Sequence, residues 1–437
     1  MYDVIVAGGG TSGCAAAYIA GKCGLKVLLI EKNIHLGGTI SSGLVVPVML
    51  SGENQINTEF YRDLIAELSS IGGQVTYQNN SGWFNPELIK IALDRMMEKA
   101  SVDVLLGTSV TSVQKAGRDI VSVSINTKIL SEYSEQIDTN NNYVFSRKIL
   151  SEPIAARYII DATGNCEIGK ISDCEFLDEN HENQPVSLRF IMSGVNLDVF
   201  GKWLLEVDSD RNVTTVENID GYTHLSTAYT WDTTRNWALA PFFDDAVSKN
   251  IIKDYDRNYF QVFTVAGMPG AVAFNCPRIV DTINPLNIID TSMALKYARS
   301  SILRITKFCK TYFPGFENAY ISNIADMLGV RVSRRIKGKY IYTIDDIKTH
   351  RTFEHPVLIS NYPVDVHSAQ KDTSILDITS DYQLPIEALM SADIDNLFVV
   401  GRCISADFKA QAALRVQASC FSMGEGVARY IANLMSY

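Results

Sequence analysis

The stretch DVIVAGGGTSG at residues 3–13 decides the fold of this chain. Its apolar part predicts a short buried strand, and the glycines that follow fit the pattern G-x-G-x-x-G. A helix of small residues is expected over 14–24, and a second buried strand over 26–31. Strand, glycine turn, helix and strand in this order predict a Rossmann β-α-β unit that binds a dinucleotide. The three glycines of the pattern are Gly8, Gly10 and Gly13.

Each part of this unit has a physical role in holding a dinucleotide. Gly8 permits the tight turn, Gly10 lets backbone N–H groups approach a pyrophosphate, and Gly13 lets the helix lie close to the sheet. The N-terminus of the helix adds partial positive charge for the phosphates. Glu31 ends the second strand near the ~20-residue offset at which a carboxylate binds the ribose hydroxyls, and this disfavours a 2′-phosphate.

The unit by itself does not separate NAD from FAD, and later parts of the chain favour FAD. A second glycine pair stands at residues 37–38. A predicted strand over 157–161 ends in Ala-Thr-Gly, and another over 396–400 precedes Gly401 and a C-terminal helix expected over 414–435. Contacts spread along the chain in this way suit a long dinucleotide stretched across a domain. We therefore expect non-covalently bound FAD.

Composition bounds the class of protein. The 437 residues suggest two or three domains, and 46% hydrophobic with 20% charged residues is typical of a globular protein with a core. The net charge of −10, from 39 basic and 49 acidic residues, gives no basic excess, so we expect no nucleic-acid partner. The eight cysteines lie singly and form no Cys/His cluster, so no metal site is predicted.

The beginning of the chain and its hydropathy predict a cytoplasmic protein. Met1 leads almost directly into an apolar strand, without the basic start and cleavage site of a secretory signal. No apolar stretch approaches the ~18–20 residues that cross a bilayer, so no membrane span is expected. Between the motifs, the pattern predicts two helices over 55–100, strands over 102–125, an exposed loop or hairpin tip over 126–153 and an amphipathic helix over 291–312.

Taken together, the motifs resemble the FAD-dependent oxidoreductase family of the glutathione-reductase-like flavoprotein superfamily. The stretches that carry the resemblance are DVIVAGGGTSGCAAA, LLIEKNIHLGGTISSGLV, YIIDATGN, LGVRVSRRIKGKYIYT, YPVDVH and LFVVGRCISADFKAQAALRVQASCFSMGEG. The resemblance implies an α/β fold. Residues 1–170 and 386–437 would form a Rossmann-like FAD-binding domain, and residues 171–385 an inserted mixed-sheet substrate domain. The substrate is then expected over the flavin ring, at the interface between the two.

The resemblance also implies which residues contact the cofactor. Val110 matches a backbone contact to adenine, and Arg402 and the helix start at Arg415 and Val416 match contacts near the flavin and pyrophosphate. The chain departs from the usual family residues at 165–166, 331–332 and 406–410, where the substrate or the flavin edge is expected. The predicted cofactor contacts are Gly8, Gly10, Thr11, Ser12, Gly13, Glu31, Lys32, Gly37, Gly38, Thr39, Val110, Ala162, Thr163, Gly164, Gly401, Arg402, Arg415 and Val416.

Candidates for the chemistry are arginines and a histidine. On a strand, Arg331 and Arg335 would share one face beside a substrate carboxylate or carbonyl, and Arg334 would point away. The alternative is a set of salt bridges at a domain interface. The pKa range of His367 suits proton transfer, and the alternative is a hydrogen-bonded loop histidine. His35, two residues before the glycine pair, is a candidate for a covalent flavin link, which family members of this type mostly lack.

Two absent motifs narrow the reaction. A second G-x-G-x-x-G unit and a C-x-x-x-x-C pair after the first helix are both missing, which disfavours an NAD(P)H domain and disulfide reductase chemistry. We expect a dehydrogenase or oxidase acting on a small organic molecule at flavin N5, with oxygen, a quinone or a carrier protein as electron partner. One alternative is a flavin monooxygenase. Such enzymes usually carry a Gly-Asp motif before the last helix, and Gly401-Arg402 at that position counts against this alternative. The other is a non-catalytic FAD-binding sensor module.

Overall fold

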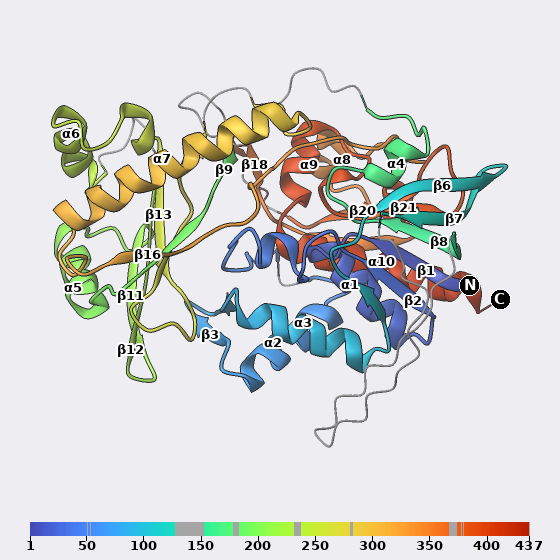
Figure 1. Ribbon diagram of the computed structural model, residues 1–437, viewed down its shortest axis with the longest axis horizontal. Coiled ribbons are helices and arrows are strands. Elements are labelled where there is room, and N and C mark those ends of the chain that lie inside the picture. Colours follow the sequence, from blue (N-terminus) through green and yellow to red (C-terminus); the bar gives the residue numbers. More distant parts are fainter. Residues whose placement is uncertain are drawn as a thin grey trace.

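A computed structural model describes residues 1–49, 51–52, 54–126, 153–177, 183–230, 237–279, 283–366, 374–376, 378 and 380–436. His367 and most of the loop predicted over 126–153 lie outside these residues. The described residues form two large sheets side by side, each with its own helices, and four two-stranded sheets. Both termini lie at the far end of the larger, mainly parallel sheet (Figure 1).

The first sheet is the predicted Rossmann sheet, and both ends of the chain build it. Its parallel strands lie in the order β5-β2-β1-β8-β21, and β7 and β6 extend it antiparallel from β8. Leu397 of β21 pairs with Ile159 of β8, so a strand from the last tenth of the chain completes the N-terminal sheet. The strands are β1 (Tyr2–Ala7), β2 (Val27–Ile30), β5 (Asp103–Leu105), β6 (Val110–Ala116), β7 (Asp119–Ile125), β8 (Ile154–Asp161) and β21 (Leu397–Val399).

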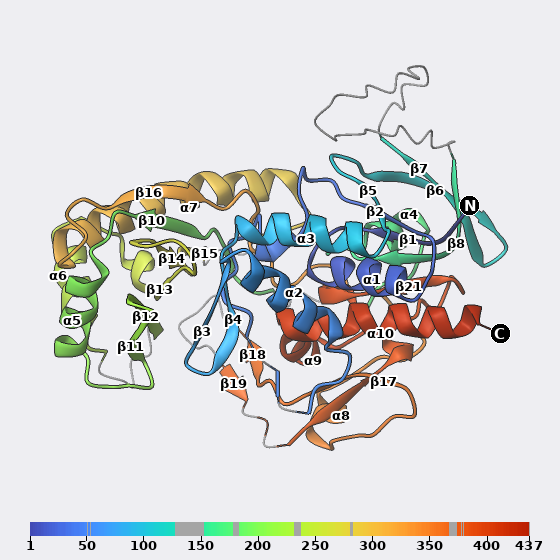
Figure 2. The same ribbon diagram turned by 90° about the horizontal axis from the view of Figure 1, so that it is seen from below.

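Helices pack closely beside this sheet because small residues line their contact. The helices are α1 (Thr11–Lys22), α2 (Glu59–Ser70), α3 (Leu88–Lys99) and α10 (Gln417–Met435) (Figure 2). A Cβ added at Gly424 of α10 would lie 2.2 Å from the backbone oxygen of Ser12 in α1. The two helix backbones therefore touch, and this contact holds the C-terminal helix against the glycine turn that follows β1.

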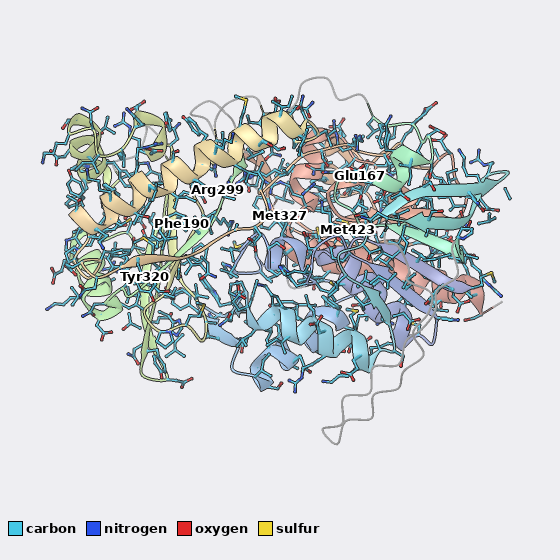
Figure 3. All side chains as sticks on the ribbon, in the orientation of Figure 1. Glu167, Phe190, Arg299, Tyr320, Met327 and Met423 are labelled. Atoms are coloured by element: carbon cyan, nitrogen blue, oxygen red, sulfur yellow. The ribbon has the colours of Figure 1, made fainter. Side chains whose placement is uncertain are left out.

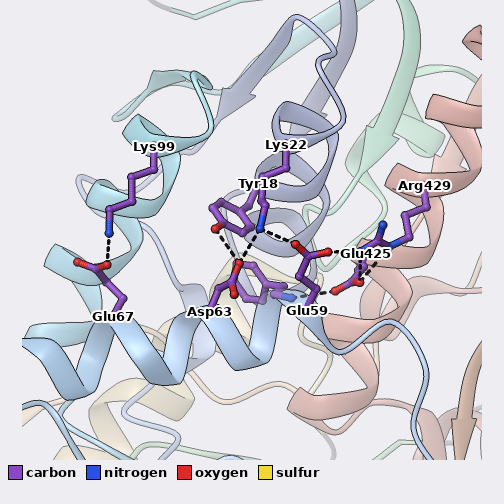
Figure 4. Close-up of polar contacts among 9 residues, drawn as sticks. Tyr18, Lys22, Glu59, Asp63, Glu67, Lys99, Glu425 and Arg429 are labelled. Atoms are coloured by element: carbon purple, nitrogen blue, oxygen red, sulfur yellow. Dashed lines mark hydrogen bonds and ion pairs between the residues drawn. The ribbon is translucent and has the colours of Figure 1, made fainter.

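A network of charged side chains joins the outer ends of these helices (Figure 4). Lys22 Nζ lies 2.8 Å from Asp63 Oδ2 and also pairs with Glu59. Arg429 bridges Glu59 and the buried Glu425, with its Nη2 atom 2.9 Å from Glu425 Oε1. The hydrogen bond from Lys22 holds the pKa of Glu59 below its usual range. Helices from the beginning and the end of the chain are thus linked electrostatically as well as by packing.

The second sheet is antiparallel, in the order β11-β12-β13-β14-β10-β16. We predicted a mixed sheet in this region, and every strand pair of this sheet is antiparallel instead. Strands β11 and β12 are joined by Asp220-Gly221, both at positive φ, and a two-residue turn of this kind produces an antiparallel hairpin. The strands are β10 (Phe190–Ser193), β11 (Thr214–Ile219), β12 (Tyr222–Thr230), β13 (Tyr259–Thr264), β14 (Val272–Phe274) and β16 (Tyr320–Ile324).

The long helix α7 (Ile288–Tyr312) crosses the antiparallel sheet and reaches toward the parallel one (Figure 1). It matches the amphipathic helix predicted over 291–312. Its buried Phe308 packs on Phe243 and Phe260, with ring centroids 4.4 and 6.4 Å away. Helices α5 (Leu197–Val207) and α6 (Ala240–Ser248) cover the outer end of the same sheet.

Local structure departs from prediction at three places. A hairpin separates the two helices expected over 55–100. The helix expected over 414–435 is preceded by a separate short helix and begins at Gln417. Residues 331–335, predicted as a strand, form irregular backbone. The other α-helices and strands of the described residues are β3 (Gln74–Tyr77), β4 (Asn80–Phe84), α4 (Glu167–Ile171), β9 (Val186–Ser187), β15 (Arg278–Ile279), α8 (Ile344–Lys348), β17 (Pro356–Ser360), β18 (Val364–Val366), β19 (Ser374–Leu376), β20 (Tyr382–Pro385) and α9 (Phe408–Leu414).

Membrane-spanning helices were sought among the described residues. Within that part of the chain, every helix is too short or too polar to cross a bilayer.

Candidate functional site

A cavity of about 790 Å³ lies between the two sheets. Its lining residues come from the ends of the parallel strands, from the starts of α1 and α10, from β13 of the antiparallel sheet, and from Asn275 directly after β14. Met327, which lines it, is seen between Phe190 on the antiparallel sheet and Glu167 beside the parallel sheet (Figure 3). The volume lies within the range of about 300–1,000 Å³ that is typical of ligand and cofactor sites.

The glycine turn after β1 forms one wall of this cavity. Gly8 has φ of +102°, and a Cβ there would lie 2.4 Å from the Ala162 oxygen. A Cβ at Gly13 would lie 1.8 Å from the Gly8 oxygen, so α1 approaches β1 as closely as backbone allows. A Cβ at Gly10 would meet no heavy atom within 4 Å, because this residue faces the cavity.

The start of α1 is equipped to bind an anion. No side chain caps this helix, and Gly10, Thr11 and Ser12 at its N-terminus all line the cavity. The first N–H groups of a helix lack intrahelical acceptors, and they carry partial positive charge. Exposed backbone donors, a helix terminus and a glycine open to the cavity together fit the pyrophosphate of a dinucleotide.

Glu31 stands at the end of β2, on the cavity wall and only 4% exposed. Its Oε2 atom accepts a hydrogen bond of 2.6 Å from the Gly9 N–H, and Oε1 accepts one of 2.8 Å from the Asn33 N–H. A carboxylate has about four acceptor positions, so two remain for ribose hydroxyls. Val110, the residue predicted beside adenine, lines the same end of the cavity.

Most of the predicted cofactor residues line this cavity. Gly13 and Gly37 lie behind its wall, where they shape the turns. Gly37 has φ of +103°, and its N–H donates to the Gly9 oxygen at 2.8 Å. The predicted residues on the wall are Gly8, Gly10, Thr11, Ser12, Glu31, Lys32, Gly38, Thr39, Val110, Ala162, Thr163, Gly164, Gly401, Arg402, Arg415 and Val416.

Arg402 and the start of α10 form a further part of the cavity wall, beside the start of α1. Arg402 Nη2 donates to Asn165 Oδ1 at 2.8 Å, and Nη1 donates to the Val330 oxygen at 3.0 Å. Burial lowers the pKa of this guanidinium. Helix α10 also begins without a side-chain cap, and Val416 and Gln417 at its N-terminus line the cavity. A second uncapped helix start therefore faces the site.

The predicted catalytic arginines separate in the structure. Arg331 lines the cavity and donates to the Pro185 oxygen and to Ser187 Oγ. Arg335 does not reach the cavity: it is 4% exposed and donates to the Ala406 oxygen at 3.3 Å. The prediction that the two share a face was wrong because the segment is irregular, so the alternation of a strand does not apply to it.

The two histidine hypotheses have different outcomes. His367 lies outside the described residues, so proton transfer by this side chain stays a prediction. His35 is described, and its ring nitrogens lie 3.2 Å from the Leu36 oxygen and 3.5 Å from Ser42 Oγ. The ring is not among the cavity-lining side chains, so this geometry gives no support to a covalent flavin link.

Sequence reasoning missed the wall that the antiparallel sheet contributes. Tyr259, Gln261 and Phe263 of β13 all line the cavity, because alternate residues of a strand face one side. Gln261 Oε1 accepts hydrogen bonds from Tyr259 Oη at 2.9 Å and from Asn275 Nδ2 at 2.8 Å. The Y-x-Q-x-F alternation was the available signal. Arg189, Tyr362 and Asp365 also line the cavity and were not predicted.

Comparisons with known proteins point to one family. A family model described as FAD dependent oxidoreductase matches residues 3–435. Thiamine thiazole synthase from Saccharolobus islandicus is 27% identical over 165 residues, which covers 37% of this chain and 55% of the synthase. The chain therefore matches about half the length of this curated relative.

Two solved structures align along the whole chain at low identity. A geranylgeranyl bacteriochlorophyll reductase-like protein from Thermoplasma acidophilum is 15% identical with a TM-score of 0.45, over 100% of this chain and 79% of that chain. L-proline dehydrogenase from P. horikoshii is 10% identical with a TM-score of 0.41, over 100% of this chain and 93% of that chain.

Proposed function

The chain belongs to the FAD dependent oxidoreductase family and binds FAD, and on this premise we propose that it transfers a hydride between flavin N5 and a small organic molecule. Bound FAD supplies the redox chemistry, and the protein supplies position, electrostatics and exclusion of water. One observation carries the proposal. The cavity that contains the glycine turn and Glu31 continues to polar side chains on the antiparallel sheet, so cofactor and substrate have room side by side.

The residues assigned to FAD lie on the parallel-sheet side of the cavity. Backbone N–H groups at the start of α1 hold the pyrophosphate, with Gly10 leaving space for it. Glu31 accepts hydrogen bonds from the ribose hydroxyls. The uncapped N-terminus of α10 carries partial positive charge at the cavity wall, where it would favour negative charge on a bound flavin.

The residues assigned to the substrate lie on the antiparallel-sheet side. The linked polar groups of Tyr259, Gln261 and Asn275 offer hydrogen bonds at fixed positions. Arg331 offers a planar guanidinium that orients a carboxylate or carbonyl of the substrate. Phe263 adds apolar surface to the same wall. This combination of apolar surface and a few fixed polar groups is typical of small-molecule sites.

Anaerobic bleaching of the flavin tests the proposal. Purified holoenzyme is mixed with a broad panel of small organic acids, alcohols, amines and ketones, first oxidised and then after photoreduction. A substrate bleaches the oxidised flavin or reoxidises the reduced one, at a rate that saturates with concentration. Rapid photoreduction without turnover by any compound would favour the non-catalytic sensor function instead.

The electron partner is tested in the same cuvette. Once a substrate has reduced the flavin, oxygen and a soluble quinone are added separately. Rapid reoxidation by oxygen identifies an oxidase. Rapid reoxidation by the quinone with slow reaction toward oxygen identifies a dehydrogenase.

A further inference from the structure

Four arginines gather at the substrate end of the cavity, brought together by strand pairing. Arg278 of β15 pairs with Ser187 of β9, and Ser187 forms a bridge with Gly329 on its other side. Arg189 and Arg331 each follow these bridged positions by two residues, so three arginines stand on neighbouring segments. Arg415 joins them from the junction of α9 and α10.

Two of these four guanidinium groups have buried nitrogen atoms without a hydrogen-bond partner among the described residues. The other two are paired: Arg189 donates to the Val46 oxygen at 3.3 Å, and Arg331 to the Pro185 oxygen. Arg278 is only 7% exposed, and in the part of the chain that the structure describes its Nε and Nη2 atoms have no hydrogen-bond partner. Its guanidinium lies 3.7 Å from the centroid of the Tyr259 ring, which lines the cavity. The Nε atom of Arg415 is likewise buried, and no described residue accepts a hydrogen bond from it. Buried charge without paired hydrogen bonds is costly, so this arrangement calls for an anion from outside the chain.

Within the described part of the chain, positive charge exceeds negative charge in this group. Among the described residues, Asp365 is the carboxylate that faces the four arginines, and its Oδ2 atom lies 3.5 Å from Arg415 Nη2. Burial, followed by the neighbouring Arg278, Arg415 and Arg189, lowers the pKa of Arg331 well below its usual range. Burial lowers the pKa of Arg189 to about 10, so it stays charged at neutral pH.

We propose that the substrate of this site is a small molecule with at least two anionic groups, carboxylates or phosphates, bound by Arg189, Arg331 and Arg415. Arg278 supports them from behind Tyr259 by its charge. This inference rests on the proposed function, in that the substrate shares the cavity with FAD. Guanidinium forks match the planar or tetrahedral oxygens of such groups, and the same charges repel amines.

Binding is measured by calorimetry on FAD-loaded protein in a buffer of low ionic strength without polyvalent anions. The probes are succinate and citrate as carboxylates, and inorganic phosphate and glycerol 3-phosphate as phosphates. Succinamide is the neutral match of succinate, and propionate is its monoanionic match. At least one polyanion is expected to bind about tenfold or more tightly than propionate, and succinamide is expected not to bind. Added salt is expected to lower the affinity of the protein for the polyanion.

Variants assign the effect to the arginines. Arg331→Gln is expected to lower the affinity for the polyanion about tenfold or more, because one charge-assisted hydrogen bond is lost. Arg278→Met provides a second variant with the same expected direction, should the first fail to fold. Arg118→Gln is the matched control: Arg118 pairs with Asp395 on the surface, and its loss should leave the affinity unchanged.

The outcomes separate this inference from the proposed function. A preference for succinate and citrate assigns carboxylates, and a preference for the phosphates assigns phosphate esters. Polyanion binding without any flavin reduction would sustain the inference and overturn the proposed function. Equal binding of succinate and succinamide, or flavin reduction by a neutral compound at the same rate in wild type and Arg331→Gln, would overturn the inference and leave the proposed function standing.

Discussion

Substitution of Gly10 by aspartate separates cofactor binding from folding. A Cβ at this position would meet no atom within 4 Å, so the side chain extends into the cavity and the surrounding backbone needs no adjustment. The added carboxylate would lie about 4 Å from a bound phosphate, where two unit charges repel by about 4 kcal/mol at an effective dielectric constant of 20. Since each ~1.4 kcal/mol is tenfold in affinity, FAD should bind about a thousandfold more weakly.

The assay compares FAD content after purification with affinity for added FAD, followed by flavin fluorescence, and checks the fold by circular dichroism. Gly10→Asp should purify folded and colourless. Gly13→Ala is the contrasting variant, because its Cβ would lie 1.8 Å from the Gly8 oxygen and should damage the fold itself. A Gly10→Asp protein that keeps its full flavin content would refute the placement of the pyrophosphate at this turn.

Three further predictions concern single side chains. Arg331→Ala should slow flavin reduction by the substrate about tenfold or more and leave FAD bound, as stopped-flow absorbance and flavin content would measure; loss of FAD would place this arginine against the cofactor instead. Glu31→Gln should lower the affinity for FAD about tenfold, because the neutral amide is a poorer acceptor for the ribose hydroxyls. An unchanged affinity in a fluorescence titration would contradict that role. Lys22 lowers the pKa of Glu59 in the folded state, so this carboxylate stabilises the protein above its ordinary pKa of 4.5 and the stability is lost as the pH falls through the lower, folded value. Urea unfolding below about pH 5 should therefore show a shallower decline for Glu59→Gln than for the wild type, and parallel declines would remove Glu59 as a contributor.

The Rossmann part of the fold could be predicted from sequence because its signals are local. The glycine turn, the helix after it and Glu31 lie within thirty residues, and each has one physical role. The structure brings Gly10 and Glu31 to one cavity, as the motif implies. The C-terminal strand at 397–399 was predictable as well, from its apolar run before Gly401.

The substrate side could not be predicted, because its residues meet only through tertiary structure. Arg189, Arg278 and Arg331 are up to 142 positions apart, and the pairing of β9 with β15 and Gly329 brings them together. The prediction that Arg335 lies beside the substrate failed for the same reason. Its direction depended on a strand that does not form, since residues 331–335 pair with no neighbouring strand along their length.

The central claim, that FAD is held non-covalently in this cavity, is tested most directly by the visible absorption spectrum of the purified protein before and after acid precipitation, with chromatography of the supernatant. We expect a yellow protein that releases FAD into the supernatant in equal amount to the chain. Flavin that stays with the pellet would mean a covalent link, with His35 the first residue to test. A colourless protein that cannot be reconstituted with FAD would contradict the account.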